Sequence, residues 1–559
     1  MGLKIKNEIF VKRYINIMIP CRDGIKLASD IYMPAGIGPF PAVLIRTPYM
    51  KSPAISPQYE KWGYYFAKKG FAYIVQDVRG RGDSEGSFYP FLNEGKDGYD
   101  SIEWISSQNW CTGKVGMDGN SYNAHVQYTA AKLKPPHLKA IAVSGSPGDF
   151  MTHGMSYLNG IKNFYMISWL MLTSGRTLQI PMEQYSLKQN DYEERNKAEV
   201  IMHLPLSEIP EELGYYSDYW IDTLKNKKDD EFYSGVKFLG EIDDIKIPGL
   251  HVSGWFDTSN AAVIDYYKEM SNNSLAKDDQ YLIVGPWHHV LLVDPKKEVG
   301  PFVFNDESVI DIMAEKVKFY KKYLLDEDEF DVPKVRIYDM GSGIWANQGR
   351  LNNIANKEYL LDDGSLSEIT IEENKQNKDK YKNYKYIEYE YNPNNPTPSY
   401  EAFCKYDVRP IAAIRRDIVK FSLVFKEDTI LDGEAEVDLV ISSDAEDTDI
   451  FVHLVVSMPS GEMIPITFNG GKLSYLEDIG LANVLPDGKR RIRLNLPYFK
   501  HSFKKNESLE LHISSCSFPM FARGLNTLED IEKGKEIKTA RNKIYCYGEF
   551  ASKIFLPIA

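Results

Sequence analysis

The chain of 559 residues has few cysteines and no long hydrophobic run. Its five cysteines are odd in number and far apart, which argues against a disulfide framework and is typical of reduced thiols in a cytoplasmic protein. No stretch approaches the roughly 20 apolar residues that a membrane-spanning helix needs. Charges interrupt every apolar run near the N-terminus, so no signal peptide is predicted. We therefore expect a cytoplasmic protein that does not bind membranes.

Sequence patterns for metal or cofactor binding are also missing. There is no H-E-x-x-H motif and no cluster of Cys and His with zinc-ligand spacing, so we predict neither a metal nor a cofactor. The formal net charge of -13 would repel the phosphate backbone of nucleic acids and anionic lipids. The expected partner is a small-molecule substrate, and association into a homo-oligomer is left open.

The first third of the sequence alternates apolar runs with helical patterns. Short apolar runs occur at 41–45, 71–75 and 138–144, and helical spacing occurs at 95–107 and from Ser121 to Lys132. Strands that alternate with helices predict a mostly parallel sheet with helices on both faces. The expected fold class is therefore α/β.

Later segments divide the chain further. Residues 149–240 show helical periodicity without a clear strand, which predicts a helical insertion, and the α/β rhythm returns at 247–257 and 280–289. From Asp417 onward, short runs alternate apolar and polar residues between turns, which is typical of a β-sandwich or jelly roll. The sequence therefore predicts three units. They are an α/β-hydrolase domain in two parts (residues 1–148 and 241–335), a helical cap (149–240) and a jelly-roll domain (336–559).

The segment Gly119–Ala124 (GNSYNA) follows an apolar run and precedes a helix. In that context the G-x-S-x-G pattern puts a serine on a tight strand-to-helix turn, with its hydroxyl exposed above the sheet edge. We take Ala124 as the counterpart of the second small residue of the pattern. The segment alone is equally consistent with an ordinary serine at a helix N-terminus.

A nucleophilic serine needs a base, and the base needs an orienting carboxylate. In α/β-hydrolases the chain order is Ser, acid, His. Asp257 and His289 each follow an apolar run after Ser121, so both are expected at the edge of the sheet where ligands bind. The alternatives are an aspartate at a helix N-terminus and a structural histidine.

With these residues the sequence resembles the CocE/NonD hydrolases, relatives of the X-prolyl dipeptidyl aminopeptidases. That group includes cocaine esterase, α-amino acid ester hydrolases and glutaryl-cephalosporin acylases. The resemblance covers nearly the whole chain. The matching segments are RDGIKLASDIYMP, RTPYMK, DVRGRGDSEG, DGYDSIEWI, GKVGMDGNSY, GWFD and GPWHH, followed in the C-terminal half by NPNNPTP, RRDIVKFS, SSDAEDTDI and CSFPMFARGLNT.

The resemblance implies Ser121 as nucleophile, Asp257 as acid and His289 as base. It also implies two oxyanion-hole donors, the phenol of Tyr49 and the backbone N–H of Tyr122. Without the resemblance, Tyr49 reads as a packed aromatic side chain. Two departures stand out, namely Ala124 in place of the second glycine of the elbow, and His288 before the expected base, where the family usually has another residue.

The loop Asp77–Gly86 contains Arg79, Arg81 and Asp83 but lacks the P-loop pattern. We expect these charges to form buried ion pairs that brace the floor of the active site. The acidic runs at 191–194 and 211–212 could recognise a substrate ammonium group, although a solvated charged face fits them better.

The cap is expected to supply the substrate pocket. Its candidate residues also fit a role in the core; they are Phe150, Tyr157, Phe164, Tyr165 and Trp169. The expected function is a serine hydrolase that cleaves carboxylic esters or amides through an acyl-enzyme. The alternatives are an X-Pro dipeptidyl aminopeptidase and, from another class, a non-catalytic carbohydrate- or partner-binding protein on a hydrolase scaffold.

Overall fold

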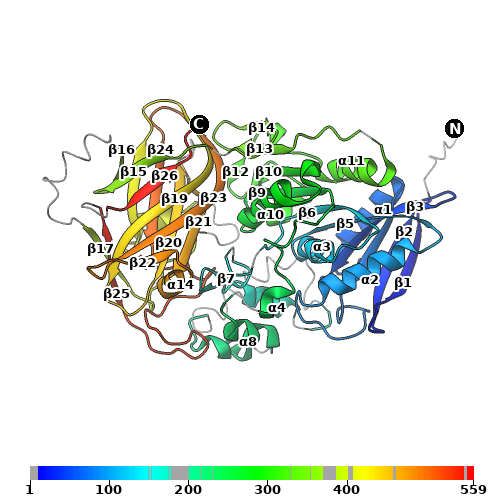
Figure 1. Ribbon diagram of the computed structural model, residues 1–559, viewed down its shortest axis with the longest axis horizontal. Coiled ribbons are helices and arrows are strands. Elements are labelled where there is room, and N and C mark those ends of the chain that lie inside the picture. Colours follow the sequence, from blue (N-terminus) through cyan, green and yellow to red (C-terminus); the bar gives the residue numbers. More distant parts are fainter. Residues whose placement is uncertain are drawn as a thin grey trace, which may run out of the picture.

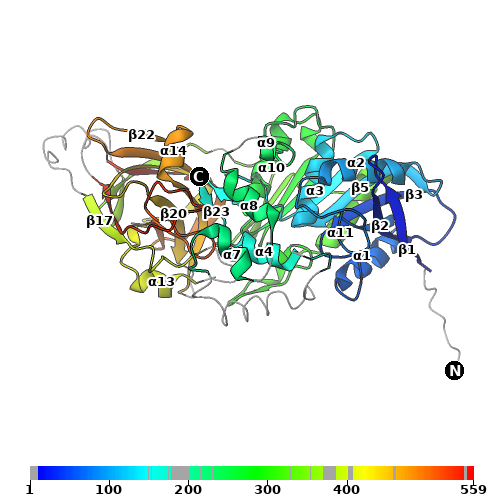
Figure 2. The same ribbon diagram turned by 90° about the horizontal axis from the view of Figure 1, so that it is seen from below.

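The computed structural model contains an α/β domain, a cap and a β-domain that lie side by side (Figures 1 and 2). Figure 1 shows the α/β domain in blue to green and the β-domain in yellow to red. The structure describes residues 10–148, 150–152, 154–173, 175–177, 201–213, 216–228, 231–327, 329–352, 354–368, 386–400, 407–457, 461–546 and 551–559.

The α/β domain is built on a ten-stranded sheet with the order β1-β2-β4-β3-β5-β6-β9-β10-β13-β14. Neighbours from β4 to β13 pair in parallel, and β1, β2 and β14 pair antiparallel at the two edges. The central strands are buried on both faces, which explains their continuous apolar runs. The strands are β1 (Lys12–Pro20), β2 (Lys26–Met33), β3 (Phe40–Thr47), β4 (Ala72–Asp77), β5 (Cys111–Asn120), β6 (Leu138–Ser144), β9 (Gly249–Phe256), β10 (Gln280–His288), β13 (Val335–Asp339) and β14 (Ile344–Gln348).

Helices cover both faces of this sheet, as the alternating pattern predicts. Helices α1 (Pro57–Lys68) and α11 (Ile312–Leu325) pack on one face, where the rings of Phe66 and Tyr320 meet. Helices α2 (Glu94–Ser106), α3 (Tyr122–Lys132) and α10 (Asn260–Asn273) pack on the other face. The mixed sheet with two helical layers confirms the predicted α/β-hydrolase fold class.

The ten-stranded sheet of the α/β domain continues past the domain boundary that we expect near residue 335. Strands β13 and β14 extend it to Gln348 before the chain enters the β-domain. Short elements on either side of β10 complete this part of the chain. Directly before β10 lies η3 (Lys277–Asp279), and after it lie η4 (His289–Leu292), β11 (Glu298–Val299), β12 (Phe302–Val303) and η5 (Asp306–Ser308).

The cap lies across the junction between the two domains, as the view from below shows (Figure 2). It contains the short hairpin β7–β8 in addition to helices, so the expectation of a segment without strands is wrong for the described part. Phe164 in the cap donates its backbone N–H to the carbonyl of Met520 in the β-domain at 3.0 Å. The cap elements are β7 (Tyr157–Leu158), β8 (Ile161–Lys162), α4 (Met166–Thr173), η2 (Leu206–Glu208), α7 (Ile209–Glu212), α8 (Asp218–Lys225) and α9 (Glu231–Ser234).

The C-terminal domain is an almost wholly antiparallel β-structure around its own apolar core, which confirms the predicted jelly-roll class. Its long strands alternate buried and more exposed residues in the way the sequence predicts. Its elements are β15 (Lys357–Asp362), β16 (Ser365–Glu368), β17 (Tyr386–Tyr391), α13 (Arg409–Ile414), β18 (Val419–Val424), β19 (Thr429–Ser443), β20 (Asp449–Ser457), β21 (Met463–Lys472), α14 (Leu473–Asp478), β22 (Ala482–Val484), β23 (Arg490–Phe503), β24 (Ser508–Ser514), β25 (Ala540–Tyr545) and β26 (Lys553–Leu556).

None of the described helices is long and apolar enough to cross a membrane. Four of the five cysteines lie in the described residues, and each of the four is a buried free thiol. Cys404 lies outside the described residues.

Candidate active site

Ser121 occupies a sharp turn between β5 and α3. Its backbone has φ 63° and ψ -127°, which is a strained conformation for a residue with a side chain. Gly119, at φ 154°, permits the turn, because a Cβ at that position would lie 2.4 Å from Cβ of Asn123. The turn therefore has the conformation of a nucleophile elbow, with the hydroxyl of Ser121 at the carboxyl end of the sheet.

The counterpart proposed for the second small residue of the elbow is wrong by one position. Two residues after Ser121 the chain has Asn123, and Ala124 is the third residue after it. The side chain of Asn123 is buried and donates from Nδ2 to the hydroxyl of Tyr59 at 2.9 Å. A larger residue fits here because Gly119 has no Cβ to meet that of Asn123, and the amide of Asn123 is bonded to Tyr59.

Asp257 and His289 follow the adjacent strands β9 and β10. Nδ1 of His289 lies 3.0 Å from Oδ1 of Asp257, which also accepts the backbone N–H of Ser259 at 2.9 Å. Burial lowers the pKa of His289, but the negative charge of Asp257 and the hydrogen bond raise it by more, so the net pKa is above its ordinary value. The predicted acid and base are thus a hydrogen-bonded pair.

Tyr49 follows β3, and its side chain reaches the hydroxyl of Ser121 at the elbow. Its hydroxyl oxygen lies 3.5 Å from Oγ of Ser121 and accepts a hydrogen bond from Nε1 of Trp169 at 3.1 Å. Burial raises the pKa of Tyr49, and the neighbouring polar groups together with the positive charge of Arg81 oppose this shift only in part. The phenol is therefore protonated at neutral pH and able to donate.

A cavity of about 110 Å³ joins these side chains. Tyr165 and Trp169, which we predict to line the pocket, do line it. Phe150, Tyr157 and Phe164 do not line this cavity and are buried in the core of the cap. The full lining is Tyr49, Phe91, Ser121, Tyr122, Pro147, Gly154, Met155, Asn163, Tyr165, Met166, Trp169, Thr258, Ser259, His289, Phe468, Met520 and Phe521.

Three of these lining residues belong to the β-domain, namely Phe468 on β21 and the neighbours Met520 and Phe521. No sequence pattern predicts them as lining residues, because they lie more than 300 positions after Ser121 in a domain with no catalytic motif. The β-domain thus forms one wall of the cavity. The wall is apolar and aromatic, which suits an apolar group of a ligand.

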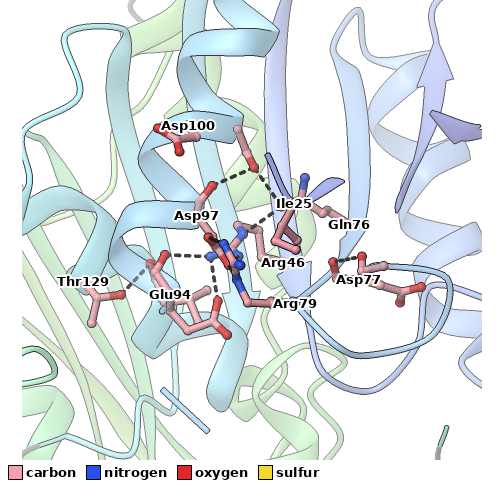
Figure 3. A network of polar contacts seen from close by, with 12 residues as sticks. Ile25, Arg46, Gln76, Asp77, Arg79, Glu94, Asp97, Asp100 and Thr129 are labelled. Atoms are coloured by element: carbon pink, nitrogen blue, oxygen red, sulfur yellow. Dashed lines mark hydrogen bonds and ion pairs between the residues drawn. The ribbon is translucent and has the colours of Figure 1, made fainter. Parts of the chain in front are cut away.

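A buried ionic network, part of which Figure 3 shows, is bonded to the first residue of the helix that follows the elbow. Arg46 on β3 is fully buried. Its Nη1 lies 2.7 Å from Oε2 of Glu94 on α2, and its Nη2 lies 3.8 Å from Oδ2 of Asp97. Oε1 of Glu94 accepts the hydroxyl proton of Tyr122, the first residue of α3, at 2.7 Å. The network therefore connects the strand before Tyr49 with the helix that follows Ser121.

The loop Asp77–Gly86 only partly meets its prediction. Arg79 forms the expected ion pair with Asp97, at 2.6 Å between Nη2 and Oδ1 (Figure 3). Arg81 is fully buried but makes no salt bridge among the described residues; it donates to the backbone carbonyls of Pro48, Thr173 and Gly175. Burial lowers the pKa of Arg81 to about 10, against the opposing charge of Asp77.

His288, the neighbour of the predicted base, has a different environment. Its Nδ1 accepts the backbone N–H of Val290 at 3.3 Å, and it does not line the cavity. Burial and the adjacent His289 lower the pKa of His288.

Of the two acidic runs, 191–194 lies outside the described residues, and Glu211 and Glu212 are exposed at the end of α7, away from the cavity lining.

No group of three or more His, Cys, Asp or Glu side chains in the described residues could hold a metal ion. The cavity instead brings together a strained serine, a tyrosine hydroxyl and a histidine at the carboxyl ends of parallel strands. This combination of mixed sheet, elbow and cap defines an α/β-hydrolase.

Residues 23–291 match the family described as X-Pro dipeptidyl-peptidase (S15 family), and residues 329–554 match the X-Pro dipeptidyl-peptidase C-terminal non-catalytic domain. The chain belongs to this family, within its CocE/NonD group of hydrolases.

Known relatives agree with this assignment. Cocaine esterase from Rhodococcus sp. (strain MB1 Bresler) is 27% identical over 568 residues, which is 97% of this chain and 98% of that protein. Two solved structures share the whole fold. An α-amino acid ester hydrolase is 21% identical with a TM-score of 0.84, and an aminopeptidase from the marine sediment archaeon Thaumarchaeota archaeon is 20% identical with a TM-score of 0.83; each comparison covers 100% of this chain and 98% of the other.

Proposed function

We propose that the protein is a serine hydrolase that cleaves carboxylic esters or amides through an acyl-enzyme on Ser121. The observation that carries this proposal is the convergence on one cavity of Ser121 in its strained turn, the Tyr49 hydroxyl 3.5 Å away, and His289 bonded to Asp257. Family membership supports a hydrolase, and the elbow geometry supports serine as its nucleophile.

In this mechanism Oγ of Ser121 attacks the carbonyl carbon of the substrate, and its proton passes to Nε2 of His289. The carbonyl oxygen becomes an oxyanion, which the Tyr49 hydroxyl and the Tyr122 N–H stabilise. The bond to the leaving group then breaks, and the leaving alcohol or amine takes the proton from His289. Water repeats these steps with the acyl-enzyme and releases the acid, while Asp257 holds the imidazole in its orientation throughout.

Labelling with a fluorophosphonate probe and mass spectrometry would test the nucleophile. We expect the probe on Ser121, no labelling of the Ser121→Ala variant, and a loss of p-nitrophenyl ester hydrolysis on the order of 10⁶-fold. Ser107→Ala is the matched control, because Ser107 is exposed at the end of α2 and should leave labelling and hydrolysis unchanged. A binding protein without activity would not react with the probe.

A second candidate function is an X-Pro dipeptidyl aminopeptidase, which the description of the matching family favours. Such a peptidase must bind the ammonium group of its substrate, and a carboxylate is the usual partner of that charge. No Asp or Glu side chain lies among the described residues that line the cavity, which favours a neutral, apolar acyl group. Faster turnover of an X-Pro p-nitroanilide than of a p-nitrophenyl ester would favour the peptidase.

A further inference from the structure

The indole of Trp169 makes a directed contact with the predicted oxyanion donor. From α4 of the cap, its Nε1–H donates to the hydroxyl oxygen of Tyr49 at 3.1 Å. The indole is stacked on the ring of Tyr122 at 5.7 Å and 18° and on Phe91 at 5.7 Å and 24°. The stacking fixes the plane of the indole and therefore the direction of its N–H.

A count of donors and acceptors shows what this contact does to the phenol. A tyrosine hydroxyl has one proton to donate and accepts two hydrogen bonds, whereas an indole N–H only donates. The hydroxyl oxygen of Tyr49 accepts from Nε1 of Trp169, and Oγ of Ser121 lies 3.5 Å from it. Because the indole cannot accept the phenol proton, that proton is left for the side of Oγ of Ser121.

We propose that Trp169 is a positioning residue that keeps the Tyr49 proton directed at the oxyanion; this rests on the proposed function. In the proposed mechanism the backbone N–H of Tyr122 donates to the oxyanion and not to the phenol. The indole N–H then remains as the donor that holds the phenol oxygen. It also increases the polarity of the phenol O–H as the negative charge develops.

Arg81 fixes the distance between the two partners. Its Nε donates to the carbonyl of Pro48, directly before Tyr49, at 2.8 Å. Its Nη1 donates to the carbonyl of Thr173, the last residue of α4, at 3.0 Å. One buried guanidinium therefore ties the turn that carries Tyr49 to the helix that carries Trp169, although the two residues belong to different parts of the chain.

The test is a double-mutant cycle between positions 169 and 49, with hydrolysis of a p-nitrophenyl ester as the readout. We expect Tyr49→Phe to lower kcat about 10²–10³-fold, and Trp169→Phe to lower kcat and kcat/KM together about tenfold. KM should change less than about twofold, because the lost contact acts on the transition state. In the Tyr49→Phe background, Trp169→Phe should change kcat less than about twofold, because no phenol is left to orient.

Trp169 also lines the cavity, so the effect of losing its N–H group must be distinguished from the effect of changing the shape of the cavity. Replacement of Trp169 by β-(benzothiophen-3-yl)alanine keeps the size of the ring system and puts sulfur in place of N–H; it should reproduce the loss seen with Trp169→Phe. Trp104→Phe is the control for loss of an indole elsewhere, because Trp104 packs against the core from α2 and does not line the cavity. Its kcat should equal that of the wild type.

Three results would overturn the inference. They are an unchanged kcat in the benzothiophene variant, an equal loss from Trp169→Phe with and without the phenol, and a loss that appears only in KM. An unchanged kcat in Tyr49→Phe would remove the phenol from the oxyanion hole and the role of Trp169 with it, while labelling of Ser121 would still support the proposed nucleophile. Failure of that labelling would instead refute the hydrolase mechanism itself.

Discussion

Oδ1 of Asp257 lies 3.0 Å from Nδ1 of His289, so the carboxylate holds the imidazole at the wall of the cavity. The side chain of Asp257 is fully buried, and that of His289 is 16% exposed. The charge of the carboxylate is therefore screened little by water, and its effect on the histidine is strong.

The pH dependence of kcat/KM should report this pair. Burial lowers the pKa of His289, and the charge of Asp257 and the hydrogen bond raise it by more, so the net pKa lies above the ordinary 6.5. Protonated His289 cannot accept the serine proton, so activity should fall as the pH falls through this raised pKa. In Asp257→Asn the fall should move to lower pH, and kcat should drop about 10⁴-fold. Asp244→Asn, at an exposed carboxylate, should leave the profile unchanged; an unshifted profile in Asp257→Asn would show that another group titrates.

The two adjacent histidines should differ sharply when each is replaced. His289→Ala should lose kcat for a p-nitrophenyl ester to nearly the same extent as Ser121→Ala, because nucleophile and base act as a unit. His288→Ala should keep kcat within about tenfold of the wild type, because that side chain accepts the backbone N–H of Val290 and does not line the cavity. The reverse order of the two losses would assign the base to His288.

Much of the site could be predicted from the sequence, because it depends on local patterns. Parallel strands that are buried on both faces appear as continuous apolar runs, and their carboxyl ends share one edge. Residues directly after such runs, here Asp257 and His289, are therefore predictable neighbours of Ser121. Tyr49 follows β3 in the same way, although only the family resemblance gave it a role.

The remaining parts depend on packing between distant segments, which leaves no local pattern. Trp169 and Phe468 belong to different domains and meet at the cavity only through tertiary contacts. The sequence places the domain boundary too early, near residue 335. The reason is that β14 is an antiparallel edge strand with half-exposed residues, which resembles the strands of the β-domain. The hydrogen bonds from Arg81 to backbone carbonyls could not be predicted, because almost any backbone position can supply such an acceptor.

The buried pair of Arg46 and Glu94 should matter for stability. Glu94→Ala leaves a fully buried guanidinium without its nearest carboxylate and removes the acceptor of the Tyr122 hydroxyl. We expect a loss of about 3–5 kcal/mol in the free energy of unfolding of the α/β domain. Asp244→Ala, which breaks the exposed pair with Lys134, should cost less than about 1 kcal/mol. Thermal unfolding followed by circular dichroism would compare the two, and equal midpoints would contradict the prediction.

Gly145 offers a test of how closely the site tolerates change. It follows β6 at φ +53°, and a Cβ there would lie 2.8 Å from Oδ2 of Asp257 and 3.0 Å from Cε1 of His289. Gly145→Ala should displace this pair and lower kcat for a p-nitrophenyl ester about 10²-fold, because small misplacements of catalytic groups are costly. Gly24→Ala is the matched control, since Gly24 also has a positive φ, +89°, but a Cβ there meets no atom within 4 Å. Each variant should lose about 1–2 kcal/mol of stability from the left-handed backbone, Gly145→Ala should lose more because its Cβ also meets Leu292 at 2.6 Å, and only Gly145→Ala should lose activity. Equal activity in the two variants would mean that the pair of Asp257 and His289 is not held in place by contact with the backbone of Gly145.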